Sequence, residues 1–127
     1  MSRLAPLRPG ALLWRLALVG AVSACVALAL MPKPPLLPGN PSDVLLHAAA
    51  FICLALASRL AFPHARAIKI ILALLVLGAG IECAQAWPLL ERDTSPQDLA
   101  VDVIAATIGL ILIDAVLSLK SGRAKVS

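Results

Sequence analysis

Four long apolar runs dominate this 127-residue chain, at about residues 11–31, 44–62, 68–87 and 99–119. A helix of about 20 residues crosses the hydrocarbon core of a bilayer, so each run is long enough to span it. No run alternates apolar and polar residues as the strands of a membrane barrel do. With 61% hydrophobic and 14% charged residues, the composition also differs from that of soluble domains. We therefore predict an all-α membrane protein, with residues 1–127 forming a single domain of four transmembrane helices.

The connecting segments and their charges predict how the helices are oriented. Residues 32–43 carry five prolines, which prevent a helix from continuing there. Nine of the 11 Lys and Arg residues lie before or near the start of the first run, around the second connection or after the fourth run. Only Lys33 and Arg92 lie on the other side. The positive-inside rule then predicts a multi-pass membrane protein with both termini and the second connection in the cytoplasm (N-in/C-in).

Several other classes of protein or site are disfavoured. The net charge of +4 needs no nucleic-acid partner, because the placement of charges matters more than their sum in a membrane protein. The three cysteines (Cys25, Cys53 and Cys83) form no CxxC pair, so neither a disulfide framework nor a zinc site is indicated. Residues 22–25 loosely resemble a lipoprotein cleavage box. However, the apolar run continues past Cys25 where a mature lipoprotein normally turns polar, which favours a membrane span.

Three ionisable residues in different runs share one expected depth. His47, Glu82 and Asp102 each lie four or five residues inside the predicted outer end of their run. At 1.5 Å per residue, they start roughly 6–8 Å below the outer interface. Ionisable groups in a membrane span are expensive and by default suggest a site. Helical spacing adds polar neighbours on the same sides: Asp43 with His47, Gln85 with Glu82, and Asp98 with Asp102.

These residues form a combined pattern: D-x-x-x-H at residues 43–47, G-x-x-I-E-x-x-Q at 78–85, and R-x-x-S-x-x-D-x-x-x-[ND] at 92–102, followed by a glycine. The pattern resembles the VanZ-like membrane proteins, a family named after a teicoplanin-resistance protein. The resemblance covers about residues 40–115 and rests on Asp43, His47, Glu82, Gln85, Arg92, Ser95, Asp98 and Gly109. The chain departs from the pattern at Val44, where lysine is frequent, and at Asp102, where asparagine is usual. The resemblance implies a small bacterial inner-membrane protein linked to glycopeptide resistance or the cell envelope.

Each polar residue also has a purely structural interpretation. Ser95 and Asp98 fit a capping box, with proline at the first helical position. Arg92 could pair with acidic neighbours in its loop, where exposed pairs contribute only about 0–1 kcal/mol. His47 and Gln85 could be interhelical ties, and Asp102 could share a hydrogen bond with His47 or Glu82. Asp114 faces away from this group and is expected to pair with a basic flank. The predicted functional cluster is Asp43, His47, Glu82, Gln85, Arg92, Ser95, Asp98 and Asp102.

Several function classes remain open. The first is a binding or envelope-modulating protein whose outward-facing polar pocket engages a lipid headgroup, a cell-wall precursor or a glycopeptide. The second is an intramembrane enzyme with Glu82 or His47 as general base and Arg92 holding a phosphate or carboxylate. The third is a proton-coupled transporter, which would require a homodimer. Small residues of the first run offer contact faces for such a dimer: Ala17 with Ala21, and Gly20 with Ala24.

We expect binding or modulation rather than catalysis, because no serine or cysteine nucleophile lies at the level of the pocket except Cys83, which is turned roughly 100° from Glu82. No cofactor is expected. No metal is expected either, since a site built from His47, Glu82 and Asp102 would lack a helical signature such as HExxH.

Overall fold

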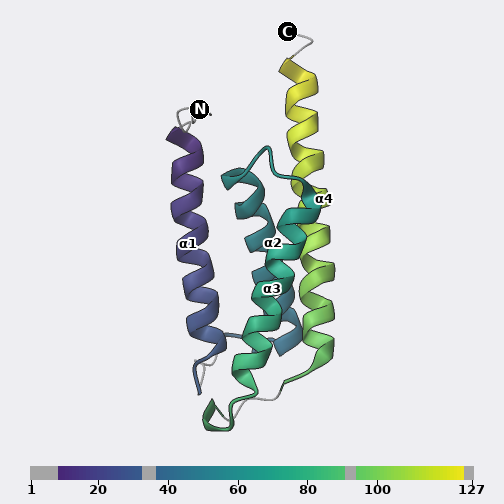
Figure 1. The fold of residues 1–127 in the computed structure, drawn as a ribbon. Coiled ribbons are helices and arrows are strands. Elements are labelled where there is room, and N and C mark those ends of the chain that lie inside the picture. The colour runs from purple at the N-terminus through teal and green to yellow at the C-terminus, as the bar shows by residue number, and fades with distance from the viewer. Residues whose placement is uncertain (1–8, 33–36, 91–93, 125–127) are drawn as a thin grey trace.

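A computed structural model describes residues 9–32, 37–90 and 94–124, and their regular structure is entirely helical (Figure 1). Apolar composition favours long helices here because a backbone in hydrocarbon must satisfy its own hydrogen bonds. The elements are α1 (Pro9–Ala29), α2 (Asp43–Ala61), α3 (Ala67–Gln85), the short 3₁₀ helix η1 (Pro88–Leu90) and α4 (Pro96–Ala124). The prediction of four transmembrane helices is confirmed, because all four α-helices are long and apolar enough to cross a bilayer.

The bounds of the third and fourth helices differ from those expected. The third helix ends at Gln85, because the chain turns through Trp87 into η1. The fourth helix begins at Pro96 rather than near residue 99, and it continues to Ala124 rather than ending near 119. Proline is tolerated at a first helical position, and basic residues such as Arg123 favour the last turn of a helix. The extra turn at its start places Asp98 inside α4.

The helices run alternately up and down, so α1 begins and α4 ends at the same end of the molecule (Figure 1). We call this the basic end, which also holds the turn at residues 62–66. The opposite end, which we call the polar end, holds the connection before α2 and the segment around η1. The predicted assignment of the basic end to the cytoplasm rests on the distribution of Lys and Arg.

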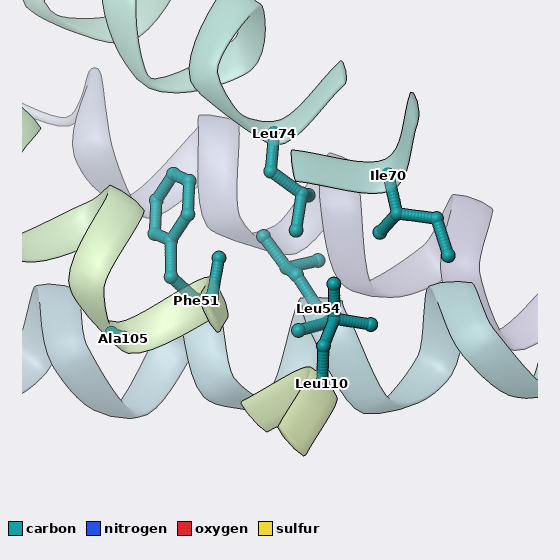
Figure 2. Packing of buried hydrophobic residues seen from close by; sticks show 8 residues of the cluster. Phe51, Leu54, Ile70, Leu74, Ala105 and Leu110 are labelled. Atoms are coloured by element: carbon teal, nitrogen blue, oxygen red, sulfur yellow. The ribbon is translucent and has the colours of Figure 1, made fainter. Parts of the chain in front are cut away.

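The core lies between α2, α3 and α4, as Figure 2 shows for Phe51, Leu54, Ile70, Leu74, Ala105 and Leu110. The main contact joins α2 to α4. It is close because Gly109 has no side chain: a Cβ there would lie 3.0 Å from the Ala55 Cβ and 3.1 Å from the Ile52 carbonyl oxygen. Small residues at crossings let membrane helices pack by van der Waals contact, which must replace the hydrophobic effect in lipid.

The first helix is peripheral, and hydrogen bonds hold it near both ends. No residue in its apolar window is buried. At the polar end, Gln85 Nε2 donates to the Ala29 carbonyl (2.9 Å). At the basic end, Arg15 Nε donates to the Ala61 carbonyl (3.2 Å), and the Arg15 guanidinium lies 4.8 Å from the centre of the Phe62 ring. Between these attachments, partly buried side chains of α1 such as Leu18 and Val22 pack against the core, and a cavity lies beside α1 near the polar end.

An ion pair joins α2 to α4 towards the basic end. Arg59, only 7% exposed, lies 2.8 Å from Asp114 through Nε and 3.1 Å through Nη2. Its Nη1 donates to the Ala65 carbonyl (2.6 Å). The expectation that Asp114 pairs with a basic residue is therefore confirmed, and its partner comes from α2. Because Asp114 pairs with Arg59 towards the basic end, it does not belong to the group of acidic residues at the polar end.

Candidate functional site

A polar cluster forms where α2, α3 and α4 meet near the polar end. We define it as four side chains: His47, Glu82, Asp98 and Asp102. One ligand atom from each of His47, Glu82 and Asp98 can be chosen so that all three lie within 4.8 Å of one another. Asp102 joins the group through His47. The predicted convergence of one imidazole and two carboxylates from three helices is confirmed, and Asp98 adds a third carboxylate.

The contact between His47 and Asp102 links α2 to α4. His47 Nδ1 lies 2.9 Å from Asp102 Oδ1, a distance at which an Nδ1–H donates to the carboxylate oxygen. Asp102 is 1% exposed. Gly78 of α3 makes room for it, since a Cβ at residue 78 would lie 2.8 Å from Asp102 Oδ2. Asp102 is therefore enclosed where three helices meet, and it orients the imidazole ring of His47.

The start of α4 does not form the expected reciprocal capping box. Ser95 does cap the helix, since its Oγ accepts from the Gln97 N–H (3.2 Å). The Ser95 N–H, however, donates to Glu82 Oε2 of α3 (3.3 Å) rather than to the Asp98 side chain. Glu82 thus accepts the hydrogen bond from the Ser95 N–H that the capping box had assigned to Asp98. A carboxylate near a helix N-terminus is favoured by the helix dipole, which benefits both acidic groups.

This exchange leaves two carboxyl groups with unused hydrogen-bonding capacity. Glu82 Oε1 is buried and has no hydrogen-bond partner among the described residues. Asp98 is 9% exposed, and its side chain makes no hydrogen bond to any residue the structure describes. A buried polar group without a partner costs free energy, so such groups call for an explanation. Both groups lie close to His47, in one set of potential ligand atoms.

The other predicted site residues lie in several places. Gln85 lies one turn from Glu82, but it turns to α1 and is buried as an interhelical tie. Asp43 is exposed in the first turn of α2, after the N-cap Ser42 whose Oγ accepts from the Leu45 N–H (3.3 Å). Ser95 is the cap of α4. Arg92 lies outside the described residues.

A cavity of about 300 Å³ lies beside the cluster, between α1, α2 and α3. Its wall is apolar except for two polar side chains, Asp43 and His47. The apolar lining comes from Cys25, Leu28, Ala29, Leu37, Leu46, Ala50, Phe51 and Ile81. The sequence did not reveal this wall, because an apolar residue facing a cavity looks the same as one facing lipid or core.

His47 connects the two features, since it both lines the cavity and contacts the cluster. The arrangement combines an apolar compartment with a group of oxygen acceptors and one imidazole. Such a site can bind a cation or a hydrogen-bond donor attached to an apolar body. No family model, curated protein or solved structure matches the chain.

Proposed function

We propose that this chain is a VanZ-like protein of the bacterial inner membrane that binds an amphiphilic envelope component or a lipidated glycopeptide. The ligand class is an amphiphile with an apolar chain and an amine-bearing headgroup. The cavity next to Asp43 and His47 carries this proposal. Small-molecule sites are typically concave, mostly apolar, and at least about 300 Å³ in volume, with a few polar groups that fix orientation.

The charge distribution favours an amine as the polar group. Six of the seven acidic residues lie at or beside the polar end in the sequence, whereas only Lys33 and Arg92 among the basic residues do. An ammonium group donates three hydrogen bonds and attracts carboxylates. The exposed Asp43 is placed to meet such a headgroup where it enters from the interface, while the apolar chain occupies the cavity.

The cavity makes a direct prediction. Ala50→Phe should fill part of it, and Asp43→Asn should remove the charge beside it. We expect each change to weaken binding of phosphatidylethanolamine or teicoplanin at least about tenfold, equivalent to about 1.4 kcal/mol. Binding of lipids and antibiotics to the detergent-purified protein would be measured by native mass spectrometry and calorimetry. The control Ala73→Phe adds the same ring on an exposed position of α3 away from the cavity, and should bind like the parent.

The choice of ligands separates the parts of this proposal. Phosphatidylglycerol lacks the amine, and vancomycin lacks the acyl chain of teicoplanin, so both should bind more weakly than their counterparts. Equal binding of all four ligands, or equal binding by Ala50→Phe and the parent, would contradict recognition through the cavity. Preference for one amine-bearing amphiphile identifies which envelope component is the ligand.

The same proposal requires the polar end to face out of the cytoplasm. In a background with the three cysteines replaced, Leu89→Cys lies in η1 at the polar end, and His64→Cys lies in the turn at the basic end. A membrane-impermeant maleimide added to intact cells (with the outer membrane permeabilised) should label Leu89→Cys and leave His64→Cys unlabelled until the cells are lysed. The reverse pattern would overturn the positive-inside assignment.

A further inference from the structure

We propose that His47, Glu82 and Asp98 form a binding site for a divalent transition-metal ion of zinc type. The proposal goes beyond the amphiphile site, and the two sites share only His47. The cavity is lined by Asp43 and His47, whereas the metal site is built from one imidazole and the carboxylates of α3 and α4. The sequence alone predicted no metal, because three single residues from three helices leave no short motif.

The spacing of the three groups suits a single ion. One ligand atom from each lies within 4.8 Å of the others. A zinc ion bound at about 2.0–2.2 Å from each tetrahedral ligand would bring these atoms to about 3.5 Å apart. The ligand atoms would therefore have to move closer together on binding than they lie in the structure. The three helices already bring one potential ligand atom each into a group of this small size.

The unused capacity of the two carboxylates is an independent indication of a ligand. Asp98 is more than nine-tenths buried and lacks a hydrogen-bond partner among residues 9–32, 37–90 and 94–124, and Glu82 Oε1 is likewise unpartnered within these ranges. Both groups belong to the same three-residue set. A cation at its centre would satisfy both carboxylates and reduce their mutual repulsion.

Asp102 supplies the outer contact that metal-binding histidines usually have. It accepts a hydrogen bond from His47 Nδ1, which leaves the Nε2 lone pair for a metal. A histidine ligand almost always donates its other ring N–H to a carboxylate or carbonyl, which fixes the tautomer and the ring orientation. The sequence had grouped Asp102 with the ligands, but its place in the fold makes it the orienting residue instead.

The donor set indicates the class of metal. Imidazole suits zinc and neighbouring first-row metals, whereas magnesium and calcium prefer ligands that are all oxygen. Three protein ligands leave at least one coordination position for water or another ligand. The expected order of affinity is therefore Zn²⁺ and Co²⁺ well above Mg²⁺ and Ca²⁺.

Titration with Co²⁺ and Zn²⁺ tests the site. The protein would be purified in detergent, stripped with EDTA and exchanged into buffer without chelator. We expect one equivalent of Co²⁺ to produce visible absorption bands, Zn²⁺ to displace it, and Zn²⁺ to raise the unfolding temperature. Glu82→Gln and Asp98→Asn should each weaken binding at least tenfold. Asp43→Asn removes a carboxylate at the same end but outside the set, and should bind metal like the parent.

The outcomes separate this site from the amphiphile site. Ala50→Phe should lose the amphiphile and keep the metal, while Asp98→Asn should lose the metal even if the amphiphile still binds. The proposal is overturned if the parent shows no Co²⁺ bands. It is also overturned if Glu82→Gln and Asp98→Asn, folded like the parent by their melting curves, bind Co²⁺ as well as the parent does. If Arg92 instead neutralises the cluster, the parent would show no Co²⁺ bands.

Discussion

Asp102→Ala should be the most destabilising single substitution in the polar cluster. Asp102 is 1% exposed, contacts His47 at 2.9 Å and fills the space above Gly78. Breaking a buried ion pair costs about 3–5 kcal/mol in soluble proteins, and an interhelical hydrogen bond in a membrane is worth up to about 2 kcal/mol. We expect a loss of about 2–3 kcal/mol, between these two ranges. The measurement is thermal or denaturant unfolding in detergent, with EDTA present.

Asp102→Asn is the matched control for this substitution. It keeps the size of the side chain and one oxygen that can accept from His47, so it should lose less stability than Asp102→Ala. If the hydrogen bond to His47 stabilises the fold, Asp102→Asn must unfold at a higher temperature than Asp102→Ala. If Asp102→Ala unfolds at the same temperature as the parent, the contact between α2 and α4 through His47 does not hold the helices together. Their association would then rest on the close packing around Gly109.

Glu82→Gln and Asp98→Asn should have the opposite effect on the metal-free protein. Each replacement removes one of two neighbouring carboxylates, and the amide oxygen introduced by Glu82→Gln can still accept from the Ser95 N–H. Functional polar sites are often held at a cost in stability, so both variants should unfold at or above the parent temperature in EDTA. Their accumulation in the membrane should match that of the parent. Asp43→Asn, at an exposed position outside the three-residue set, should leave the unfolding temperature unchanged.

A double-mutant cycle sharpens this prediction. If the two carboxylates repel each other, neutralising the second should add less stability than neutralising the first. Contacting charged residues typically couple by about 0.5–3 kcal/mol. If instead both single variants melt well below the parent or fail to accumulate, Glu82 and Asp98 are structural ties between α3 and α4. The proposal that they serve a ligand would then lose its main support.

The fold follows from local features of the sequence to a large extent. Each span is recognisable by about 20 apolar residues, and the breaks fall at proline-rich or polar segments. The first connection contains Gly39 and Asn40, both with positive φ, which no helix can accommodate. The boundaries of α4 were less predictable, because a polar segment such as residues 120–124 can be either helix or tail. In the structure this segment is helical, because it continues α4 without a break.

The candidate site was predictable in its location but not in its contacts. Depth along each helix places His47, Glu82 and Asp102 at one level, and the structure brings them together. The capping signature at residues 95–98 assigned Asp98 to its own helix, yet Glu82 of α3 accepts from Ser95 instead. Gln85 was grouped with Glu82 by spacing, yet it is attached to α1. Spacing along one helix specifies a direction, whereas the partner in that direction depends on the neighbouring helix.

The sequence by itself determined four membrane spans, their ends to within a few residues and the common depth of the ionisable groups. These depend on hydrophobicity and on a rise of about 1.5 Å per residue, which are local properties. The tertiary structure decided that Asp102 orients His47, that Asp98 is buried without a hydrogen bond to any described residue, and that α1 closes a cavity beside them. The physical reason is that the pairing of buried polar groups depends on how rigid helices rotate and pack against one another. In this chain, that packing depends on Gly78 and Gly109.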